Sequence, residues 1–364
     1  MKYIDEFKDR NLCLALIKEM EFLLGASEVS IMEVCGTHTM AIFREGLRSL
    51  LPPAVRLLSG PGCPVCVTPT AYLNKAIALS AGEGVIIATF GDMMRVPGSN
   101  SSLERQRATG KKIAVVYSPL EALAIAANNP DKEVVFLAVG FETTAPTLAV
   151  TAIEAKKRGI ANFYLLSGNK RVLPALASLA GDGDLRVDGF ILPGHVSAII
   201  GVKPYLFLAE KYGLPSVICG FEPLDILQGI CMILRQLKEG RADVEIQYRR
   251  VVKKDGNAEA MALLQKVFVE TDSEWRGLGP IAESGYDLRE EYGELDANRV
   301  FSPRLDRVEM ASVESDGCLC GEILKGLKIP NQCPHFGKSC VPSSPVGPCM
   351  VSSEGTCAAY YKYG

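Results

Sequence analysis

The chain has 364 residues, with 39 Lys and Arg against 42 Asp and Glu, 3 His, 1 Trp and 12 Cys. At about 150 residues per domain, this length predicts two or three domains with enough core to fold without disulfides. A net charge of −3 argues against a partner such as nucleic acid or an anionic membrane, because both require a concentrated basic surface. The apolar content of 48% excludes disorder as the overall state.

We expect no export signal, because residues 1–10 mix acidic and basic side chains and contain no apolar run. The most apolar stretch, residues 76–90, is interrupted by Gly82-Glu83-Gly84 and is too short to span a bilayer. We therefore expect a cytoplasmic protein. In that reducing compartment, cysteines serve more often as metal ligands or catalytic groups than in disulfides.

The first motif in chain order follows an apolar run at 29–31 and reads Cys35-Gly36-Thr37-His38-Thr39. A thiol close to hydroxyl groups and an imidazole suits a nucleophile or an iron ligand, because a neighbouring base can activate the sulfur. The alternative is an unconnected pair of core residues. Cys35 and His38 are therefore candidate site residues.

The second motif is a Cys-x-x-Cys within a Gly/Pro turn, Gly60-Pro-Gly-Cys63-Pro-Val-Cys66. Two thiols at this spacing can form a redox pair, because one pKa is lowered and oxidation closes a small ring, or they can chelate a soft metal. The alternative is a turn in which two small residues pack. A rigid Gly/Pro loop is a poor place to bury thiols, so we favour a function for Cys63 and Cys66.

From about residue 57 to 240, short apolar runs rich in β-branched residues alternate with helical segments rich in Ala and Leu. This pattern predicts an α/β fold with parallel strands covered on both faces. The predicted strands are 84–90, 112–117, 133–139, 161–166, 189–192 and 216–219.

Polar side chains follow several of these strands, among them Asp92, Glu142 and His195. Ligands of open parallel sheets bind outside the carboxyl ends of the strands, so these turns predict the edge of a cleft. The turn at 140–144 could equally be a helix N-cap, and it lacks the glycine pattern of ATP-binding or dinucleotide-binding loops.

The Gly-Phe-Glu turn occurs twice, 80 residues apart, and each copy follows an apolar strand. This predicts two similar parallel-sheet lobes that face a cleft, at residues 54–137 and 138–240. Residues 1–53 and 241–364 would then form a helical part, including an amphipathic helix at 258–269, and a C-terminal cysteine-rich domain.

Half of the cysteines lie in the last 47 residues, where no periodicity predicts an independent core. Four of them have the spacing C-x14-C-x6-C-x16-C, and two more lie between them. Four thiols in Pro-containing loops suit an iron–sulfur cluster, whereas structural zinc sites usually take closely spaced cysteine pairs, which this tail lacks. Zinc stays as the alternative. The four candidate ligands are Cys318, Cys333, Cys340 and Cys357.

The two remaining tail cysteines, Cys320 and Cys349, could form a redox-active dithiol beside such a cluster. Spacing alone does not decide which four of the six bind. The alternative is that both are buried thiols without a redox role.

Taken together, these motifs resemble the HypD family of hydrogenase formation proteins. The resemblance rests on the segments 35–39, 60–66, 91–98, 140–144 and 193–196 and on the four-cysteine tail. It implies a maturation factor for [NiFe]-hydrogenases that works with the small chaperone HypC. The complex of the family member with HypC would assemble an iron that carries two cyanides and one carbon monoxide. HypE together with HypF would deliver the cyano groups.

The resemblance also implies a role for each cysteine. Cys35 would hold the iron together with a thiol of HypC, and Cys63 and Cys66 would be a redox or iron-binding pair near it. Cys318, Cys333, Cys340 and Cys357 would bind a [4Fe-4S] cluster, and Cys320 with Cys349 would pass electrons from it.

The residue types suit this chemistry, because low-spin iron favours thiolate ligands and each cyanide ligand requires two electrons. His38, His195, Asp92 and Glu142 are candidates for orienting ligands or transferring protons, the alternative being turn-stabilising hydrogen bonds. Two other functions stay open. One is a free-standing iron–sulfur thiol–disulfide oxidoreductase that acts on protein substrates, and the other is a zinc-stabilised interaction protein.

Overall fold

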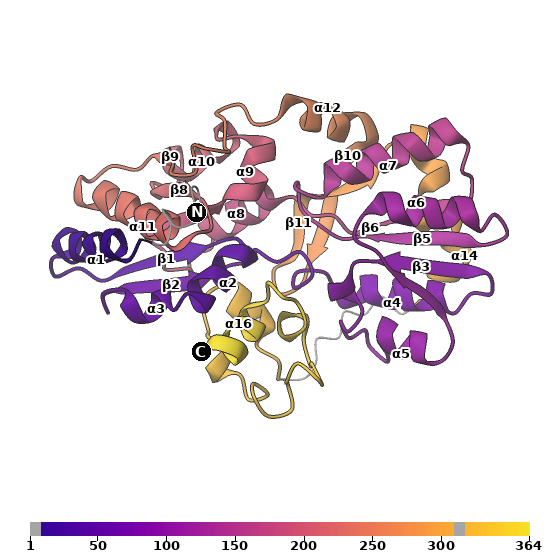
Figure 1. Ribbon diagram of the computed structural model, residues 1–364, viewed down its shortest axis with the longest axis horizontal. Coiled ribbons are helices and arrows are strands. Elements are labelled where there is room, and N and C mark those ends of the chain that lie inside the picture. The colour runs from indigo at the N-terminus through magenta and orange to yellow at the C-terminus, as the bar shows by residue number, and fades with distance from the viewer. Residues whose placement is uncertain (1–8, 309–316) are drawn as a thin grey trace.

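The computed structural model describes residues 9–308 and 317–364 and contains two parallel sheets, an antiparallel hairpin between them and a cysteine-rich C-terminal segment (Figure 1). The predicted α/β class is confirmed. None of the described helices combines the length and apolarity needed to cross a membrane.

The first sheet has the order β2-β1-β7-β8-β9, and all its pairings are parallel. Its strands are β1 (Val29–Glu33), β2 (Val55–Ser59), β7 (Gly189–Pro193), β8 (Ser216–Cys219) and β9 (Val244–Ile246). Successive side chains point to opposite faces, so the strands supply two cores. One face packs against α1 (Arg10–Leu24), α2 (Gly36–Arg44), α3 (Leu47–Leu50) and α11 (Pro223–Lys238). The other packs against α8 (Val172–Ala180), α9 (Gly194–Ile200), η3 (Lys203–Tyr205) and α10 (Phe207–Glu210).

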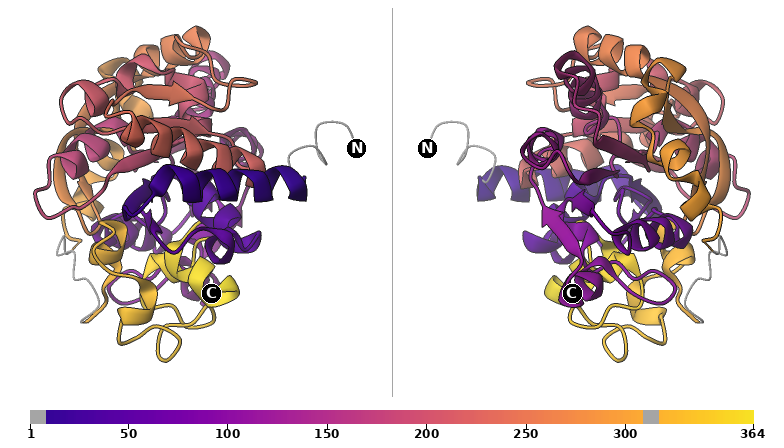
Figure 2. Two further views of the ribbon diagram at one scale, coloured as in Figure 1. Left: turned by 90° about the vertical axis from the view of Figure 1, so that its left-hand side faces the viewer. Right: turned by 90° about the vertical axis from the view of Figure 1, so that its right-hand side faces the viewer.

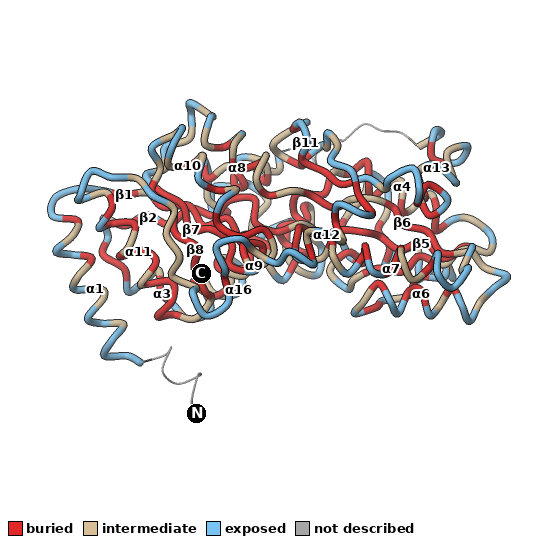
Figure 3. The backbone as a smooth tube through the Cα atoms, turned by 90° about the horizontal axis from the view of Figure 1, so that it is seen from above, coloured by how far each residue is buried: buried red, intermediate tan, exposed pale blue. Residues whose placement is uncertain are grey.

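The second sheet has the order β4-β3-β5-β6, also entirely parallel. Its strands are β3 (Val85–Thr89), β4 (Lys112–Val115), β5 (Glu133–Ala138) and β6 (Phe163–Ser167). One face packs against α6 (Pro119–Asn128), α7 (Ala145–Arg158) and α12 (Ala258–Val267). The other contacts α4 (Thr70–Ser80), α5 (Leu103–Ala108), α13 (Ala297–Val300) and α14 (Ser302–Leu305). Figure 3 shows buried strands through the middle of both sheets and exposed residues on the outer helices.

Sheet membership divides the chain differently from the predicted lobe limits. Strand β6 lies beyond the predicted boundary at 137/138 yet pairs with β5, and β1, placed outside both lobes, pairs with β2 and β7. The reason is that strand neighbours in a parallel sheet are set by crossover connections rather than by order in the chain.

A long hairpin joins the two sheets and was not predicted from the sequence. The predicted helix at 258–269 ends at Val267, and β10 (Phe268–Trp275) then pairs antiparallel with β11 (Gly279–Leu288). Most residues of β10 are polar and partly exposed, so its sequence lacks the apolar alternation of a half-buried strand. The short helix η4 (Glu290–Leu295) follows β11, the second strand of the hairpin.

The C-terminal segment lies below the two sheets, on the side of α2 (Figures 1 and 2). It contains α15 (Cys320–Leu324), η5 (Pro330–Gln332), η6 (Pro348–Met350) and α16 (Thr356–Tyr363). Helix α16 packs on α2, and Cys320, Leu324, Cys349 and Val351 belong to the core shared by both sheets. The segment therefore contributes to a common core, although its sequence shows no periodicity.

Candidate thiol and metal site

Cys35 lies between β1 and α2, as the residue that precedes the first turn of the helix. Its sulfur lies beside the backbone N–H groups of Thr37 and His38, which act to stabilise a thiolate. Burial nevertheless raises the pKa of Cys35 to about 11, and the nearby carboxylate of Glu354 adds to this rise. Without a metal, the Cys35 thiol is therefore protonated at neutral pH.

The loop that carries Cys63 and Cys66 rests directly on Cys35. The Gly36 N–H donates to the Gly62 carbonyl at 3.0 Å, and the Gly60 N–H donates to the Glu33 carbonyl at 2.8 Å. A Cβ atom at Gly62 would lie 2.3 Å from the Cys35 nitrogen. Glycine at position 62 is therefore what allows the two backbones to touch.

The sulfur atoms of Cys63 and Cys66 are both buried, and their acidities differ. The Cys66 N–H donates to the Cys63 sulfur at 3.2 Å, and the Cys63 thiol donates to Ser352 Oγ at 3.2 Å. Burial raises the pKa of Cys63. Burial also acts to raise the pKa of Cys66, but hydrogen bonds with Cys349 and Cys63 and the charge of Arg276 outweigh it and bring that pKa to about 5. The predicted pair thus contains one thiolate and one thiol.

Cys320 and Cys349 form a second buried pair, with their sulfur atoms 3.0 Å apart. Contacts with the sulfur atoms of Cys320, Cys357 and Cys66 raise the pKa of Cys349 well above its usual value. Cys349 therefore touches one member of each of the other cysteine groups in the tail and the loop. Cys349 thus interacts with the tail thiol of Cys357 and with the loop thiol of Cys66.

The four predicted cluster ligands lie near one another in the C-terminal segment. Burial is the main cause of the raised pKa values of Cys318 and Cys340, and the charges of Cys333 and Cys357 raise both further. At Cys318 the charge of Cys320 has the larger effect. The Cys340 sulfur accepts the Val346 N–H at 3.4 Å. Within residues 9–308 and 317–364, no three Cys, His, Asp or Glu side chains are already gathered around the position of a single ion.

Asp92, predicted at the cleft edge, is joined to the loop pair through the C-terminal segment. Its Oδ2 accepts hydrogen bonds from Ser352 Oγ at 3.2 Å, Ser353 N at 3.2 Å and Ser353 Oγ at 3.0 Å. Because Cys63 donates to the same Ser352 hydroxyl, a hydrogen-bonded path leads from Cys63 to the partly exposed Asp92.

The two predicted histidines meet on one aromatic ring. His38 and His195 stack on Phe221 with ring centroids 4.6 Å and 4.0 Å away, and His38 Nε2 is 2.9 Å from the Gly220 carbonyl. Burial lowers the pKa of His38 to about 4, so its ring is neutral at pH 7. The backbone N–H of His38 thus lies beside the Cys35 sulfur, whereas the His38 ring contacts Gly220 and Phe221 in the turn after β8.

Glu142 lies in the turn after β5, and among the described residues no hydrogen bond joins it to a cysteine. Its Oε1 accepts the Val172 N–H at 3.0 Å, at the start of α8, and among the described residues its buried Oε2 has no hydrogen-bond partner. Burial raises the pKa of Glu142 to about 7. Hydrogen bonds thus connect Asp92 to Cys63 through Ser352, whereas among the described residues none connects Glu142 to a thiol.

Two residues of the site were missed by sequence reasoning. Glu354 accepts the Thr37 hydroxyl proton at 2.6 Å beside Cys35, and Arg276 donates to the Thr68 carbonyl at 3.0 Å and to Thr70 Oγ1 at 2.7 Å. Glu354 could have been suspected from its place between tail cysteines. Arg276 lies in the turn of an unpredicted hairpin, where nothing in the sequence links it to Cys66.

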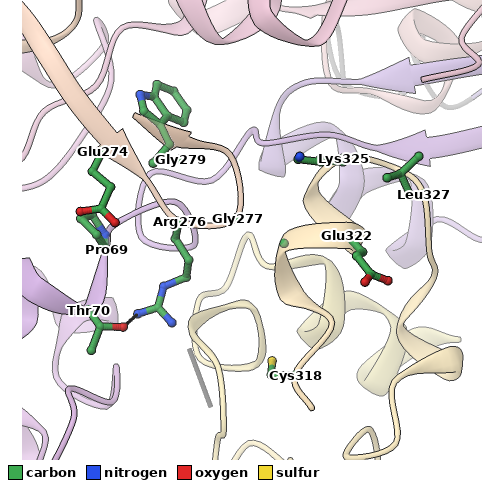
Figure 4. Close-up of a pocket in the computed structure, with 12 residues that line it drawn as sticks. Pro69, Thr70, Glu274, Arg276, Gly277, Gly279, Cys318, Glu322, Lys325 and Leu327 are labelled. Carbon is green, nitrogen blue, oxygen red and sulfur yellow. Dashed lines mark hydrogen bonds between the residues drawn. The ribbon is translucent and has the colours of Figure 1, made fainter. Parts of the chain in front are cut away.

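A cavity of about 440 Å³ opens where the hairpin turn meets the C-terminal segment (Figure 4). Arg276 points toward Thr70 on one side, and Cys318, Glu322 and Lys325 line the other. The cavity therefore gives solvent a path to a predicted cluster ligand.

Comparisons with known protein families and with curated proteins point to the same family. The family model HypD, described as the hydrogenase formation hypA family, matches residues 11–364. The chain is 46% identical over 371 residues to the hydrogenase maturation factor HypD of Rhodobacter capsulatus, covering 100% of this chain and 98% of that protein. It is 46% identical over 375 residues to the HypD of Azotobacter vinelandii, and the match covers 100% of this chain and 97% of that protein. The HypD of Escherichia coli (strain K12) is 44% identical over 372 residues, which cover 100% of this chain and 98% of that protein.

Proposed function

The chain belongs to the HypD family of hydrogenase maturation factors, and from this premise we propose that it scaffolds the assembly of an Fe(CN)2CO group with HypC in the cytoplasm. In this role Cys35 holds the iron, the buried thiols supply electrons, and HypE with HypF delivers the cyano groups. The observation that carries the proposal is the 3.0 Å sulfur contact of Cys349 with Cys320, together with the interactions of Cys349 with Cys357 and with Cys66 in the loop packed on Cys35.

The surroundings of Cys35 suit a site that binds iron as substrate. The Cys35 thiol must lose its proton to become a ligand, so binding is favoured as the pH rises. The Thr37 and His38 N–H groups stabilise the resulting thiolate. The Glu354 carboxylate, which disfavours the thiolate in the absence of metal, attracts a dication placed at the same sulfur.

The thiol contacts support a two-electron transfer from the tail pair to the loop pair. When Cys63 and Cys66 are joined as a disulfide, Cys349 loses its proton and attacks the Cys66 sulfur, and Cys63 leaves as a thiolate. Cys320 then attacks Cys349 and releases the Cys66 thiolate. The tail pair ends as a disulfide. Of the two protons that it loses, one is taken up by Cys63 and the other goes to solvent, because Cys66 stays a thiolate.

The acidity of each loop thiol fits its part in this exchange. Cys66, whose pKa is about 5, is a good leaving group in the second attack, because leaving improves as the pKa of a thiol falls. The Cys63 thiolate, whose pKa is high, takes up a proton, and Ser352 and Asp92 provide the path to it.

The tail thiols fit a [4Fe-4S] cluster. The four cysteines interact with one another in the C-terminal segment, and their wide spacing in the sequence favours a cluster over zinc, which usually takes closely spaced pairs. The Val346 N–H at Cys340 is the kind of donor that stabilises cluster thiolates. When bound, such a cluster would supply single electrons to the tail pair.

Infrared spectroscopy of the protein purified anaerobically with its HypC partner tests the iron assignment. We expect cyanide and carbonyl stretches in the wild-type complex and none in Cys35→Ala. Cys231→Ala is the matched control, because Cys231 is a buried thiol of α11 outside the site. Bands that persist in Cys35→Ala would show that the iron is held elsewhere.

The absorption spectrum of the same anaerobic preparation tests the cluster. We expect a brown protein with a band at about 400 nm that Cys340→Ala weakens. A colourless protein containing zinc would overturn the cluster assignment.

A free-standing thiol–disulfide oxidoreductase is the second candidate, favoured by the low pKa of Cys66. The burial of the loop pair argues against it, since Cys63 is 3% exposed and Cys66 is 0% exposed. A protein disulfide cannot reach these sulfur atoms without movement of the loop. Reduction of protein disulfides by Cys35→Ala at the wild-type rate, in the absence of HypC, would favour this candidate.

A further inference from the structure

A second cavity, of about 310 Å³, shares Pro69 and Glu274 in its lining with the cavity of Figure 4. Its walls come from α4, the loop after β6, both strands of the hairpin and α13. The volume is at the small end of the range for ligand sites. None of the functions discussed above uses this cavity.

Asn169, in the loop after β6, lines the cavity and has an unsatisfied polar atom. The residue is 2% exposed, and its Oδ1 has no hydrogen-bond partner among the described residues. An acceptor buried in this way costs about 1–3 kcal/mol unless a donor reaches it. The backbone carbonyl of the same residue is already paired with the Tyr286 N–H, so the unmet acceptor is the side chain alone.

Two ammonium groups lie in the wall of the same cavity. The buried Lys170 Nζ donates to Ser273 Oγ and to the Glu274 carbonyl, which leaves its third proton for another acceptor. Lys75 Nζ donates to Asn298 Oδ1 at 2.9 Å and likewise retains donors. The cavity can therefore bind an anionic group.

An acidic group faces these two lysines. Asp287 lies in β11, and burial raises its pKa while the charges of Lys170 and Lys75 act to lower it. Asp296 also faces Asp287 and raises its pKa, and Glu274 acts on Lys170 from β10. Asp287 and the Asn169 amide oxygen are thus acceptors for a cationic or N–H donor group.

The remaining wall is polar at Thr68, Ser167, Thr271, Asp272 and Ser273 and apolar at Pro69, Ala71 and Tyr72. The Tyr72 ring lines the cavity and is held in place because its hydroxyl donates to the Leu166 carbonyl at 2.9 Å. A ligand that matches the whole cavity has an anionic end for the lysines, a donor end for Asn169 and Asp287, and a small hydrocarbon part for the ring. We propose that this cavity binds a small zwitterion of the free amino acid class.

Ligand-observed NMR and calorimetry on the full-length protein test the proposal. The probes are the free amino acids, with acetate and ethylamine as compounds that carry only one of the two charged ends. We expect at least one amino acid to bind saturably at concentrations below about 10 mM and acetate and ethylamine to bind at least about tenfold more weakly. Absence of saturable amino acid binding, or equal binding of acetate, would overturn the proposal.

Two variants place the binding in this cavity. Lys75→Met removes an ammonium from a partly exposed position, and we expect it to weaken binding by about tenfold, the effect of losing one charge-assisted hydrogen bond. Asn169→Leu removes the unsatisfied acceptor and should weaken binding similarly. Lys203→Met is the matched control, because Lys203 pairs with Asp255 on the surface away from the cavity. An affinity unchanged in both test variants would refute the site, and circular dichroism checks that each variant folds.

Discussion

The contact between Gly62 and Cys35 gives the sharpest prediction for the proposed iron site. In Gly62→Ala, the added Cβ would lie 2.3 Å from the Cys35 nitrogen and 2.4 Å from its Cα. Both are backbone atoms, so the clash cannot be relieved by rotating a side chain. Ordinary contact begins near 3.4 Å, and the loop that carries Cys63 and Cys66 must therefore move away from Cys35 by roughly 1 Å.

This displacement has separable costs in stability and in function. Overpacking of this kind costs about 1–3 kcal/mol, so we expect the melting temperature to fall by about 1–4 °C. A 1 Å misplacement of reacting groups lowers rates by about 100-fold. Hydrogenase activation should therefore drop by about that factor while the protein stays folded.

Complementation of a cell lacking its own family member, followed by hydrogen-uptake assays, measures the functional loss. Gly183→Ala is the matched control, because a Cβ at Gly183 meets no atom within 4 Å and the residue has no positive φ. Growth at reduced temperature separates the loss of stability from the misplacement of the loop. Activation by Gly62→Ala equal to that by Gly183→Ala would refute the role of this contact.

The buried thiols and carboxyl groups give three further expected outcomes. Arg276→Gln should shift the titration of the Cys66 thiolate to higher pH, because a nearby positive charge is lost, and Arg276→Lys should shift it less. Ultraviolet absorbance measured against pH, with Cys66→Ser as the reference, follows this titration. A titration curve that Arg276→Gln leaves unchanged would contradict the role of Arg276. Because the pKa of Glu142 is about 7 in the folded chain and about 4.5 in the unfolded chain, the folded state binds the extra proton, and stability is lost as the pH rises through that interval. Glu142→Gln should therefore reduce, by up to about 3 kcal/mol, the free energy of unfolding that is lost between pH 5 and pH 8. Urea unfolding at the two pH values measures this difference. A pH dependence as large as that of the wild type would show that Glu142 does not have the raised pKa. Cys349→Ser should leave Cys63 and Cys66 oxidised after anaerobic reduction of the cluster, as measured by differential alkylation and mass spectrometry; reduction equal to that in Cys231→Ser would mean that electrons take another path.

Local signals were sufficient for the strands and for the candidate thiols. Apolar runs bounded by Gly and Pro predicted β3 through β8 within a few residues, because buried parallel strands need continuous apolar sequence. The spacing of the cysteines likewise separated Cys35, the loop pair and the tail. The hairpin β10–β11 escaped prediction because its mostly polar, partly exposed residues resemble a loop.

The arrangement of the thiols depends on contacts between distant parts of the chain. Cys63 meets Ser352 across 289 residues, and Thr37 meets Glu354 across 317. Such contacts form only when the C-terminal segment docks against both sheets, so no local pattern contains them.

The sequence by itself determined the α/β class, the strands and the reactive residue types, because these follow from periodicity and from the chemistry of single side chains. Only the tertiary structure decided the sheet neighbours of β1 and β6 and the role of Cys349 as the thiol between the other groups. It also decided that Cys66 is acidic while Cys63 is not. The physical reason is that acidity and contact depend on burial and on charges such as Arg276, which folding brings from distant positions.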